Sequence, residues 1–492
     1  MKVWEKVEFN SYIFTLALLP CVILIYYGVQ KFKAPWIGKV ILILFSFYFI
    51  LYAGTKNLVF LVLSMIVNYL LSFFIKEKGE TIILSKLAVS FSLIFNIGFL
   101  GYTKYTYFII ENLDKRLGIH WEIEDIFIPL GISFVTFQQI AYVIDVYRKK
   151  VANCSLLDYI LYIVYFPKYI QGPIARYSDF EQEINKSRKF DTDSFAYGIW
   201  LFVTGLGKKV LIADIFSKAV SWGIGYSIDH MTAMDAIFVV LSFTFQIYFD
   251  FSGYSSMAIG ISKMFNISLP DNFDSPYQSY SVIEFWKKWH ISLTSFLRAY
   301  LYIPLGGNKK GKIRYYLNMF FVFCISGIWH GAAWTYIVWG GLQGAAYCLN
   351  KLFYKQWMKI NQILQWILTF IFINISWLFF RALSVSQALD ILKKIFRMEN
   401  TSISDGLINC FKIPEITFLS NRYEGIATFV TEHRGIEMWL FLMAAMVLSL
   451  SMKDKCSEKF KPSLGKCIIT ILVFSWSVIS FSTVVEYIYG GF

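Results

Sequence analysis

Long apolar runs separated by short polar segments dominate the chain. Runs of spanning length lie near residues 12–29, 36–53, 58–75, 87–103, 126–145, 155–172, 195–215, 233–249, 250–265, 314–328, 333–352, 362–382, 438–452 and 466–488. About 20 consecutive apolar residues are enough for a helix to cross the hydrocarbon core of a bilayer. Because some of these runs are expected to be re-entrant or half-length, the pattern predicts about 11 to 13 spans.

The composition agrees with a chain whose main solvent is lipid. Of its 492 residues, 57% are hydrophobic and 16% are charged, whereas soluble domains carry about 25% charged residues. The apolar runs resemble spanning helices and not the alternating segments of about 10 residues that build membrane barrels. We therefore predict an all-α integral membrane fold with residues 1–492 in one polytopic domain.

The net charge of +13 does not indicate a nucleic-acid partner, because Lys and Arg are concentrated in short loops between apolar runs. Such loops are typical of the inner face of a membrane. The distribution of these charges over the first five spans favours an N-terminus outside the cytoplasm. The seven cysteines and five histidines show no metal-ligand spacing, so we expect no metal site and no bound cofactor.

One stretch, residues 384–437, interrupts the apolar rhythm and is mostly polar. We expect an extramembrane loop there. Residues 388–396 place apolar side chains at helical spacing, which predicts a short surface helix at the start of that loop.

The densest polar content among the apolar runs begins at residues 246–254. Asp250 lies in this apolar run, and Tyr254 follows it. A carboxylate inside a membrane segment normally faces a cavity or a partner. Alternatively, Asp250 caps a helix that starts at Phe251. From the residues alone, both interpretations remain open.

A second segment, residues 281–298, carries a histidine among tryptophans. On a continuous helix, Trp286, His290, Leu293 and Leu297 would share one face. The sequence around them also contains Lys287, Lys288, Trp289 and Arg298. The segment is therefore either part of a functional site or an interfacial helix whose lysines contact lipid phosphates.

The third segment runs from Ser326 to Trp334 and places His330 after Trp329 and before three small residues. Small residues allow another helix or a thin ligand to approach closely. An ionisable residue in an apolar run indicates a functional site by default, although buried structural histidines also occur. A histidine kept neutral there would be ready to accept a proton.

These segments carry a family resemblance. The chain resembles the membrane-bound O-acyltransferase family, in particular the bacterial (AlgI-like) branch typified by the membrane subunit of alginate O-acetyltransferase. The resemblance rests on ordered motifs at residues 129–148, 166–180, 246–260, 272–307 and 327–334, within a core of about 125–350. A sister branch (DltB-like) transfers D-alanine from a carrier protein to teichoic acid.

The resemblance implies an architecture and a location. The family fold would be a ring of helices around a thin central site, with funnels from both faces. The acyl donor would enter from the cytoplasm and the acceptor from outside. Such a protein would lie in a bacterial plasma membrane as a multi-pass chain.

The resemblance also implies roles for single residues. His330 matches the family's signature catalytic histidine, and His290 matches a second functional histidine. We expect His330 to act as the base toward the attacking hydroxyl. His290 would hydrogen-bond the thioester carbonyl or donate to the leaving thiolate.

The remaining candidate residues fall into two groups. Expected pocket-lining residues are Asp250, Tyr254, Trp286, Trp289, Trp329 and Ser326. Expected contacts to donor phosphates are Lys287, Lys288 and Arg298. The donor would be acyl-coenzyme A or a phosphopantetheine-bearing carrier protein, and the acceptor an extracellular polysaccharide or cell-wall polymer.

Three other functions stay open at this point. The chain could transfer D-alanine to teichoic acid, or it could be a transport protein whose histidines line a polar path. It could also pass acetyl groups to a secreted SGNH-hydrolase-like partner. Residues 486–492 depart from the aromatic C-terminus expected in the alginate branch, which leaves the docking of such a partner in doubt.

Overall fold

The computed structural model describes residues 8–29, 34–77, 82–118, 121, 126–151, 155–186, 190–226, 228–456, 460–481 and 487–488. In these ranges the chain forms helices and connections without a strand, so the all-α prediction is confirmed. Two compact units are present. One contains residues 1–206, 254–271 and 456–492, and the other contains residues 207–253 and 272–455.

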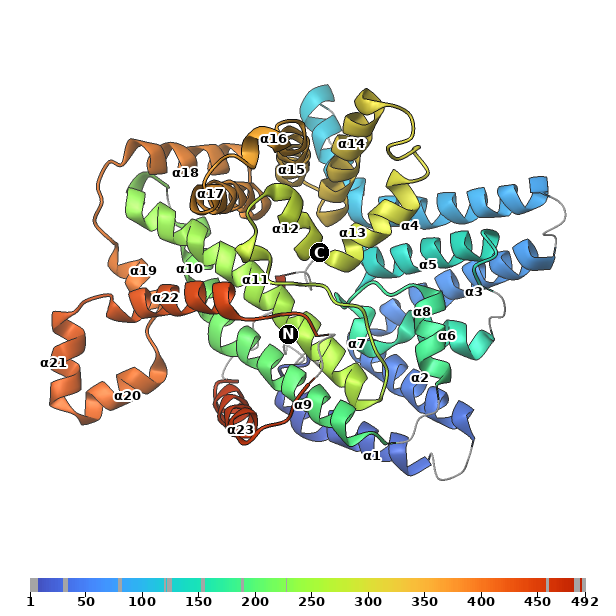
Figure 1. Cartoon of the computed structure of the whole chain (residues 1–492), viewed down its shortest axis with the longest axis horizontal. Helices are drawn as coiled ribbons and strands as arrows, with labels where there is room; N and C mark the ends of the chain where they lie inside the picture. Colours follow the sequence, from blue (N-terminus) through green and yellow to red (C-terminus); the bar gives the residue numbers. More distant parts are fainter. Residues whose placement is uncertain are drawn as a thin grey trace. The chain divides into compact units, whose positions relative to one another are not determined.

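The first unit contains most of the N-terminal helices (Figure 1). They are η1 (Phe14–Leu18, a π-helix), α1 (Leu19–Val29), α2 (Pro35–Tyr52), α3 (Thr55–Glu77), α4 (Ile82–Leu117), α5 (Ile132–Tyr147), α6 (Leu156–Val164), α7 (Phe166–Tyr169), α8 (Tyr177–Asn185), α9 (Thr192–Gly207) and α23 (Leu464–Ile479). Buried amides join two of them, because the Asn96 side chain of α4 donates to Asn68 Oδ1 of α3 at 2.7 Å.

The second unit contains the segments singled out from the sequence. Its helices are η3 (Lys208–Ala213), α10 (Asp214–Gly225), η4 (Ile228–His230), the first part of α11 (Ala233–Met264), η5 (Pro276–Gln278), α12 (Val282–Lys288), α13 (Ile291–Leu297), η6 (Arg298–Tyr302), α14 (Lys312–His330), α15 (Trp334–Leu352), α16 (Tyr354–Trp357), α17 (Gln362–Arg381), α18 (Val385–Arg397), α19 (Asp405–Cys410), α20 (Pro414–Arg422), α21 (Glu424–Glu432) and α22 (Ile436–Ser451). Residues of α11 from Tyr254 onward belong to the first unit.

Several helices have the length and composition of membrane spans. Among the described residues these are α3, α4, α11 and α17, with the bent pair α21–α22 as a fifth. Three shorter apolar helices cover residues 14–29, 36–52 and 464–479. The chain is thus a multi-pass membrane protein, while the number of 11 to 13 spans and their ring arrangement stay predictions.

Two helix boundaries differ from the sequence-based expectation. The runs 233–249 and 250–265 form one helix, α11, so Asp250 lies inside a helix and does not cap one starting at Phe251. The run 155–172 is broken, because α6 ends at Val164 and α7 begins at Phe166 with Pro167 in its first turn. Proline is tolerated in a first turn but not in a helix interior.

Residues 384–437 are built of short helices. The surface helix expected at 388–396 is present within α18, and the Ser384 side chain caps it by accepting from the Gln387 N–H. Farther along, α21 meets α22 at a bend of 78°, and α20 and α21 extend away from α22 (Figure 1).

Candidate active site

His290 and His330 lie close together in the second unit. Their ring centroids are 6.5 Å apart and their planes are inclined by 48°. Both side chains are buried, with exposed fractions of 1% and 4%. His290 lies between α12 and α13, whereas His330 is the last residue of α14. The fold thus brings together two histidines from separate sequence motifs.

A break in the helix positions His290. The continuous helix expected over 281–298 is wrong, since α12 ends at Lys288 and α13 begins at Ile291. Trp289 is extended, and His290 adopts a left-handed conformation with φ 43° and ψ 54°. This conformation costs a residue with a Cβ roughly 1–2 kcal/mol. Trp286 and Leu293 therefore do not share one helical face with His290.

Hydrogen bonds from Asn272 and Asp274 hold the chain on both sides of this turn. The Asn272 carbonyl accepts from the Ile291 N–H at 3.0 Å, and the Asp274 N–H donates to the Lys288 carbonyl at 3.0 Å. Asn272 Oδ1 also accepts from Ser292 Oγ–H at 2.6 Å. These bonds fix the left-handed turn and hence the direction of the His290 side chain.

Close packing of α14 against α15 positions His330. A Cβ added at Gly327 would lie 2.3 Å from the Tyr336 carbonyl oxygen and 3.0 Å from the Gly340 Cα. The two helices lie side by side (Figure 1). The small residues around His330 therefore allow close helix approach, as the sequence predicted.

Aromatic rings surround the two imidazoles. Phe251 lies edge-on to His290 with centroids 4.7 Å apart. Trp339 and Phe380 each lie 5.2 Å from His330, and Trp329 lies 4.9 Å from it. Such apolar surroundings favour neutral imidazoles. A neutral imidazole offers one N–H donor and one lone pair, so this pair can take up and deliver a proton.

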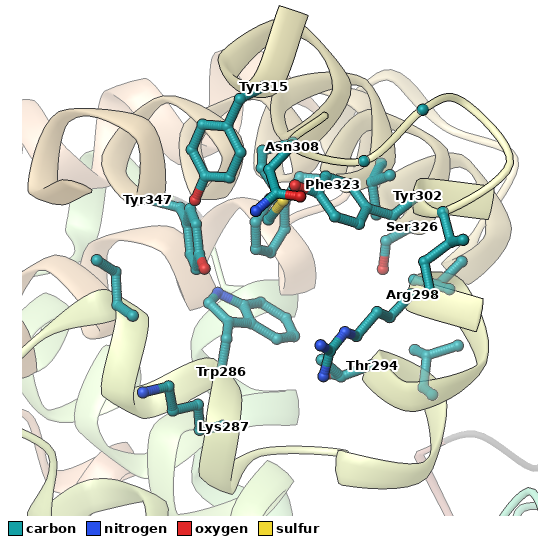
Figure 2. Close-up of a pocket in the computed structure, with 18 of the residues that line it drawn as sticks. Trp286, Lys287, Thr294, Arg298, Tyr302, Asn308, Tyr315, Phe323, Ser326 and Tyr347 are labelled. Carbon is teal, nitrogen blue, oxygen red and sulfur yellow. The ribbon is translucent and has the colours of Figure 1, made fainter. Parts of the chain in front are cut away.

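A pocket of about 770 Å³ lies beside this pair in the same unit. Figure 2 shows Trp286, Lys287, Arg298 and Ser326 among the side chains that line it. Ser326 precedes His330 by four residues on α14, which is about one helical turn or 6 Å. The pocket wall at Ser326 therefore lies about one helical turn from His330.

Hydrogen bonds fix the Trp286 side of the pocket. The Trp286 indole N–H donates to Gln343 Oε1 at 3.0 Å, and the Gln343 amide donates to Ser376 Oγ at 2.8 Å. Gln343 and Ser376 are fully buried. Gln343 is not among the residues predicted from the sequence, although an amide inside an apolar helix is a signal that could have identified it.

Asp250 belongs to a buried ion-pair cluster. It pairs with Lys209 at 2.7 Å, and Lys209 also pairs with Asp214 at 2.9 Å. Lys209 offsets part of the negative charge of the two carboxylates, and Asp250 is not among the residues that line the pocket. Its assignment to the substrate site stays a prediction.

The remaining candidates also lie outside the lining of this pocket. Trp289 packs against Phe285 and Trp377, with centroids at 5.4 and 5.0 Å. Lys288 pairs with Glu284 at 2.8 Å. Tyr254 belongs to the first unit, where its ring stacks on Phe9 at 5.1 Å.

Comparison with known proteins supports the family resemblance that was inferred from the sequence motifs. Residues 118–385 match the profile of the membrane-bound O-acyltransferase family. A peptidoglycan O-acetyltransferase from Helicobacter pylori is 37% identical over 427 residues, covering 80% of this chain and 81% of the relative.

Two further relatives come from the two expected branches. A probable alginate O-acetylase from Pseudomonas aeruginosa is 33% identical over 403 residues, covering 81% of this chain and 76% of the relative. A teichoic acid D-alanyltransferase from Streptococcus thermophilus is 26% identical over 255 residues, covering 47% of this chain and 59% of the relative. Similarity thus extends over more of the chain in the O-acetylating relatives.

Proposed function

The chain belongs to the membrane-bound O-acyltransferase family, and from this premise we propose that it transfers acetyl groups from a cytoplasmic thioester to polymer hydroxyls outside the cytoplasm. The acceptor is a polysaccharide or a cell-wall polymer. The protein lies in a bacterial plasma membrane with its N-terminus outside. The observation that carries the proposal is the buried pair of His290 and His330, with ring centroids 6.5 Å apart.

His330 acts as the general base in this reaction. It accepts the proton of the acceptor hydroxyl as the hydroxyl oxygen attacks the thioester carbonyl carbon. A new C–O bond forms, the C–S bond breaks, and the proton finally reaches the leaving thiolate. Gly327 and Gly331 on either side of His330 let α15 and the Tyr336 ring pack closely against this end of α14, which holds His330 in place.

His290 acts on the opposite side of the reacting carbonyl. Its N–H donates to the carbonyl oxygen as negative charge develops there, or to the leaving sulfur. A hydrogen-bond donor held in advance at the position of developing charge commonly contributes about 10²–10³ to the rate. The left-handed turn at His290 supports this role, because it holds the imidazole in one direction.

The identity of the acceptor rests on the relatives. Two of them are named for O-acetylation, one of peptidoglycan and one of alginate. Both names point to a carbohydrate hydroxyl as the acceptor. The D-alanylating relative covers less than half of this chain, so we assign acetyl and not D-alanyl as the transferred group.

The test is acyl transfer by the purified chain in phosphatidylcholine proteoliposomes. Labelled acetyl thioesters of coenzyme A and of a phosphopantetheine carrier protein are supplied, with peptidoglycan fragments or alginate oligosaccharides as acceptors. We expect ester-linked label in the acceptor with wild-type protein and with His433→Ala, which changes an exposed histidine. We expect about 10³-fold slower labelling with His330→Ala.

Other outcomes separate the remaining functions. Label that reaches the polymer only after a secreted protein fraction is added would establish a relay to a secreted partner. Movement of substrate across the liposomes with no thioester turnover would identify a transport protein and contradict the proposal. Unchanged turnover in His330→Ala would remove the assignment of the base.

A further inference from the structure

We propose that the corner between α15 and α17, residues 349–361, binds the headgroups of anionic phospholipids. The corner consists of the last turn of α15, the short helix α16 and the turn that leads into α17. The proposed reaction uses none of its residues, so the inference is independent of acyl transfer. It is carried by the charges of the corner, its exposed apolar side chains and its position at the end of a membrane span.

Three lysines give the corner its positive charge. Lys351, Lys355 and Lys359 follow one another at intervals of four residues. All three are exposed, and within the described ranges none of them is paired with a carboxylate. The sequence also contains no aspartate or glutamate from Phe285 to Leu389. Positive charge that the surrounding chain leaves uncompensated favours an anionic partner.

Large apolar side chains are exposed between these lysines. Leu352, Phe353, Tyr354 and Met358 have exposed fractions of 57%, 51%, 46% and 56%. A lysine can lay its aliphatic stem along such a surface while its ammonium group reaches the phosphate level. Lysines that alternate with exposed leucine and aromatic side chains are typical of a segment that lies in the interface of a bilayer.

The position of the corner identifies a lipid surface as its partner. Asn361 caps α17, and α17 begins at Gln362 with the length and composition of a membrane span. Its 20 residues extend over about 30 Å, which is the thickness of the hydrocarbon core. The residues directly before α17 therefore lie at the level of the lipid headgroups, where the lysines meet phosphates and the apolar side chains meet the upper acyl chains.

Hydrogen bonds hold the corner in one conformation. The Trp357 indole N–H donates to the Tyr280 carbonyl at 2.9 Å. The Gln365 amide of α17 donates to the carbonyls of Trp357 and Ile360, each at 2.9 Å. The lysines and apolar side chains are therefore presented on a fixed backbone, and a preorganised surface loses less conformational entropy when it binds.

The test is photo-crosslinking of lipids to the full-length protein in phosphatidylcholine nanodiscs. A trace of phosphatidylglycerol or of phosphatidylcholine carries a diazirine at the top of one acyl chain, and mass spectrometry measures the label on residues 349–361. The test variant combines Lys351→Gln, Lys355→Gln and Lys359→Gln.

A matched control removes the same number of positive charges elsewhere. It combines Lys115→Gln, Lys186→Gln and Lys393→Gln, because these exposed lysines are each paired with a carboxylate. Both variants change only exposed side chains, so we expect them to unfold at the temperature of the wild type.

We expect phosphatidylglycerol to label the corner at least ~10-fold more than phosphatidylcholine, because each lysine near a membrane surface adds roughly 5-fold to the attraction for anionic lipid. The test variant should lower the phosphatidylglycerol label to the phosphatidylcholine level, whereas the control variant should keep the wild-type preference. In the wild type, the preference should decrease as salt rises.

Four results would overturn the inference. Two are equal labelling by both lipids in the wild type and a preference for phosphatidylglycerol that the test variant keeps. The third is a loss of preference that is as large in the control variant, since net charge and not the corner would then be the cause. The fourth is absence of label from both lipids while an amine crosslinker joins Lys355 of two chains, which would assign the corner to a second copy of the protein.

Discussion

The imidazole rings of His290 and His330 have centroids 6.5 Å apart, although the two residues come from different helical segments. Hydrogen bonds to a reacting oxygen are about 2.6–3.2 Å long. A single carbonyl or hydroxyl oxygen between the rings can therefore lie within reach of a nitrogen on each. The simplest role for the two histidines is therefore to contact one reacting group from two sides.

The contact between Gly327 and Gly340 should be sensitive to a single methyl group. A Cβ at Gly340 would lie 2.6 Å from the Phe323 carbonyl oxygen, and backbone atoms cannot yield as a flexible side chain can. We expect Gly340→Ala and Gly327→Ala each to lose roughly 1–3 kcal/mol of stability. The thermal unfolding midpoint in detergent measures this loss.

Gly341→Ala is the matched control for that experiment. Gly341 is on the same helix, and an added Cβ would meet nothing within 4 Å. Its unfolding midpoint should equal or exceed that of the wild type, because alanine is the better helix former. Equal destabilisation at positions 340 and 341 would show that helix approach is not the cause.

The buried cluster of Lys209 with Asp250 and Asp214 predicts an order of stabilities. Lys209→Met leaves two buried carboxylates without their cation, and removing one partner of a buried ion pair costs about 3–5 kcal/mol. Asp250→Asn should cost less, since Lys209 keeps Asp214 at 2.9 Å. Thermal unfolding should rank wild type above Asp250→Asn and that variant above Lys209→Met.

An exposed ion pair serves as the control for the buried Lys209 cluster. Lys115 and Glu111 are largely exposed and 2.6 Å apart, and such pairs contribute about 0–1 kcal/mol. Lys115→Gln should leave the unfolding midpoint nearly unchanged. If Lys209→Met were as mild, the buried cluster would not stabilise the second unit.

Asn272 should affect the rate of acetyl transfer, because its hydrogen bonds hold the turn that orients His290. Ser292→Ala removes the hydroxyl that donates to Asn272 Oδ1 at 2.6 Å, and Ser292→Thr retains one. Small misplacements of a catalytic group can lower a rate by about 100-fold. We expect Ser292→Ala and Asn272→Ala to reduce kcat by about 10- to 100-fold with KM little changed.

Ser292→Thr distinguishes positioning from general damage to the fold. The threonine variant should recover most of the wild-type kcat, because its hydroxyl can again donate to Asn272. Steady-state kinetics of acetyl transfer provide both constants. A drop in kcat that is the same for alanine and threonine would contradict a role for this hydrogen bond.

Sequence alone predicted the helical membrane class and the two histidines, because apolar runs and local motifs are readable without tertiary contacts. It missed the break at Trp289 and His290, since no proline or glycine marks it. The break depends on hydrogen bonds from Asn272 and Asp274, which lie in a different segment. Secondary-structure spacing cannot reveal a turn that distant residues impose.

The partners of buried charged residues could not be predicted from the sequence either. Asp250 was predicted to face a cavity or a partner, or to cap a helix, but the sequence alone could not identify Lys209 of η3 as that partner. Lys287 and Arg298 line the pocket, whereas Lys288 is paired with Glu284, and the predicted contacts of all three with donor phosphates stay predictions. Adjacent lysines on a helix point in different directions, and only the packed structure decides which one faces the pocket.

The central claim is that His290 and His330 act on one reacting group, and the most direct measurement is a double-mutant comparison of acetyl transfer. Wild type, His290→Ala, His330→Ala and the double variant are reconstituted side by side, with His433→Ala as the control. We expect His330→Ala to lose about 10³-fold and His290→Ala about 10²-fold in kcat.

Residues that act as a unit have non-additive effects, so the double variant should be no slower than His330→Ala. A double variant slower by the product of the two single effects would contradict the claim, as would transfer by His330→Ala at the rate of the His433→Ala control.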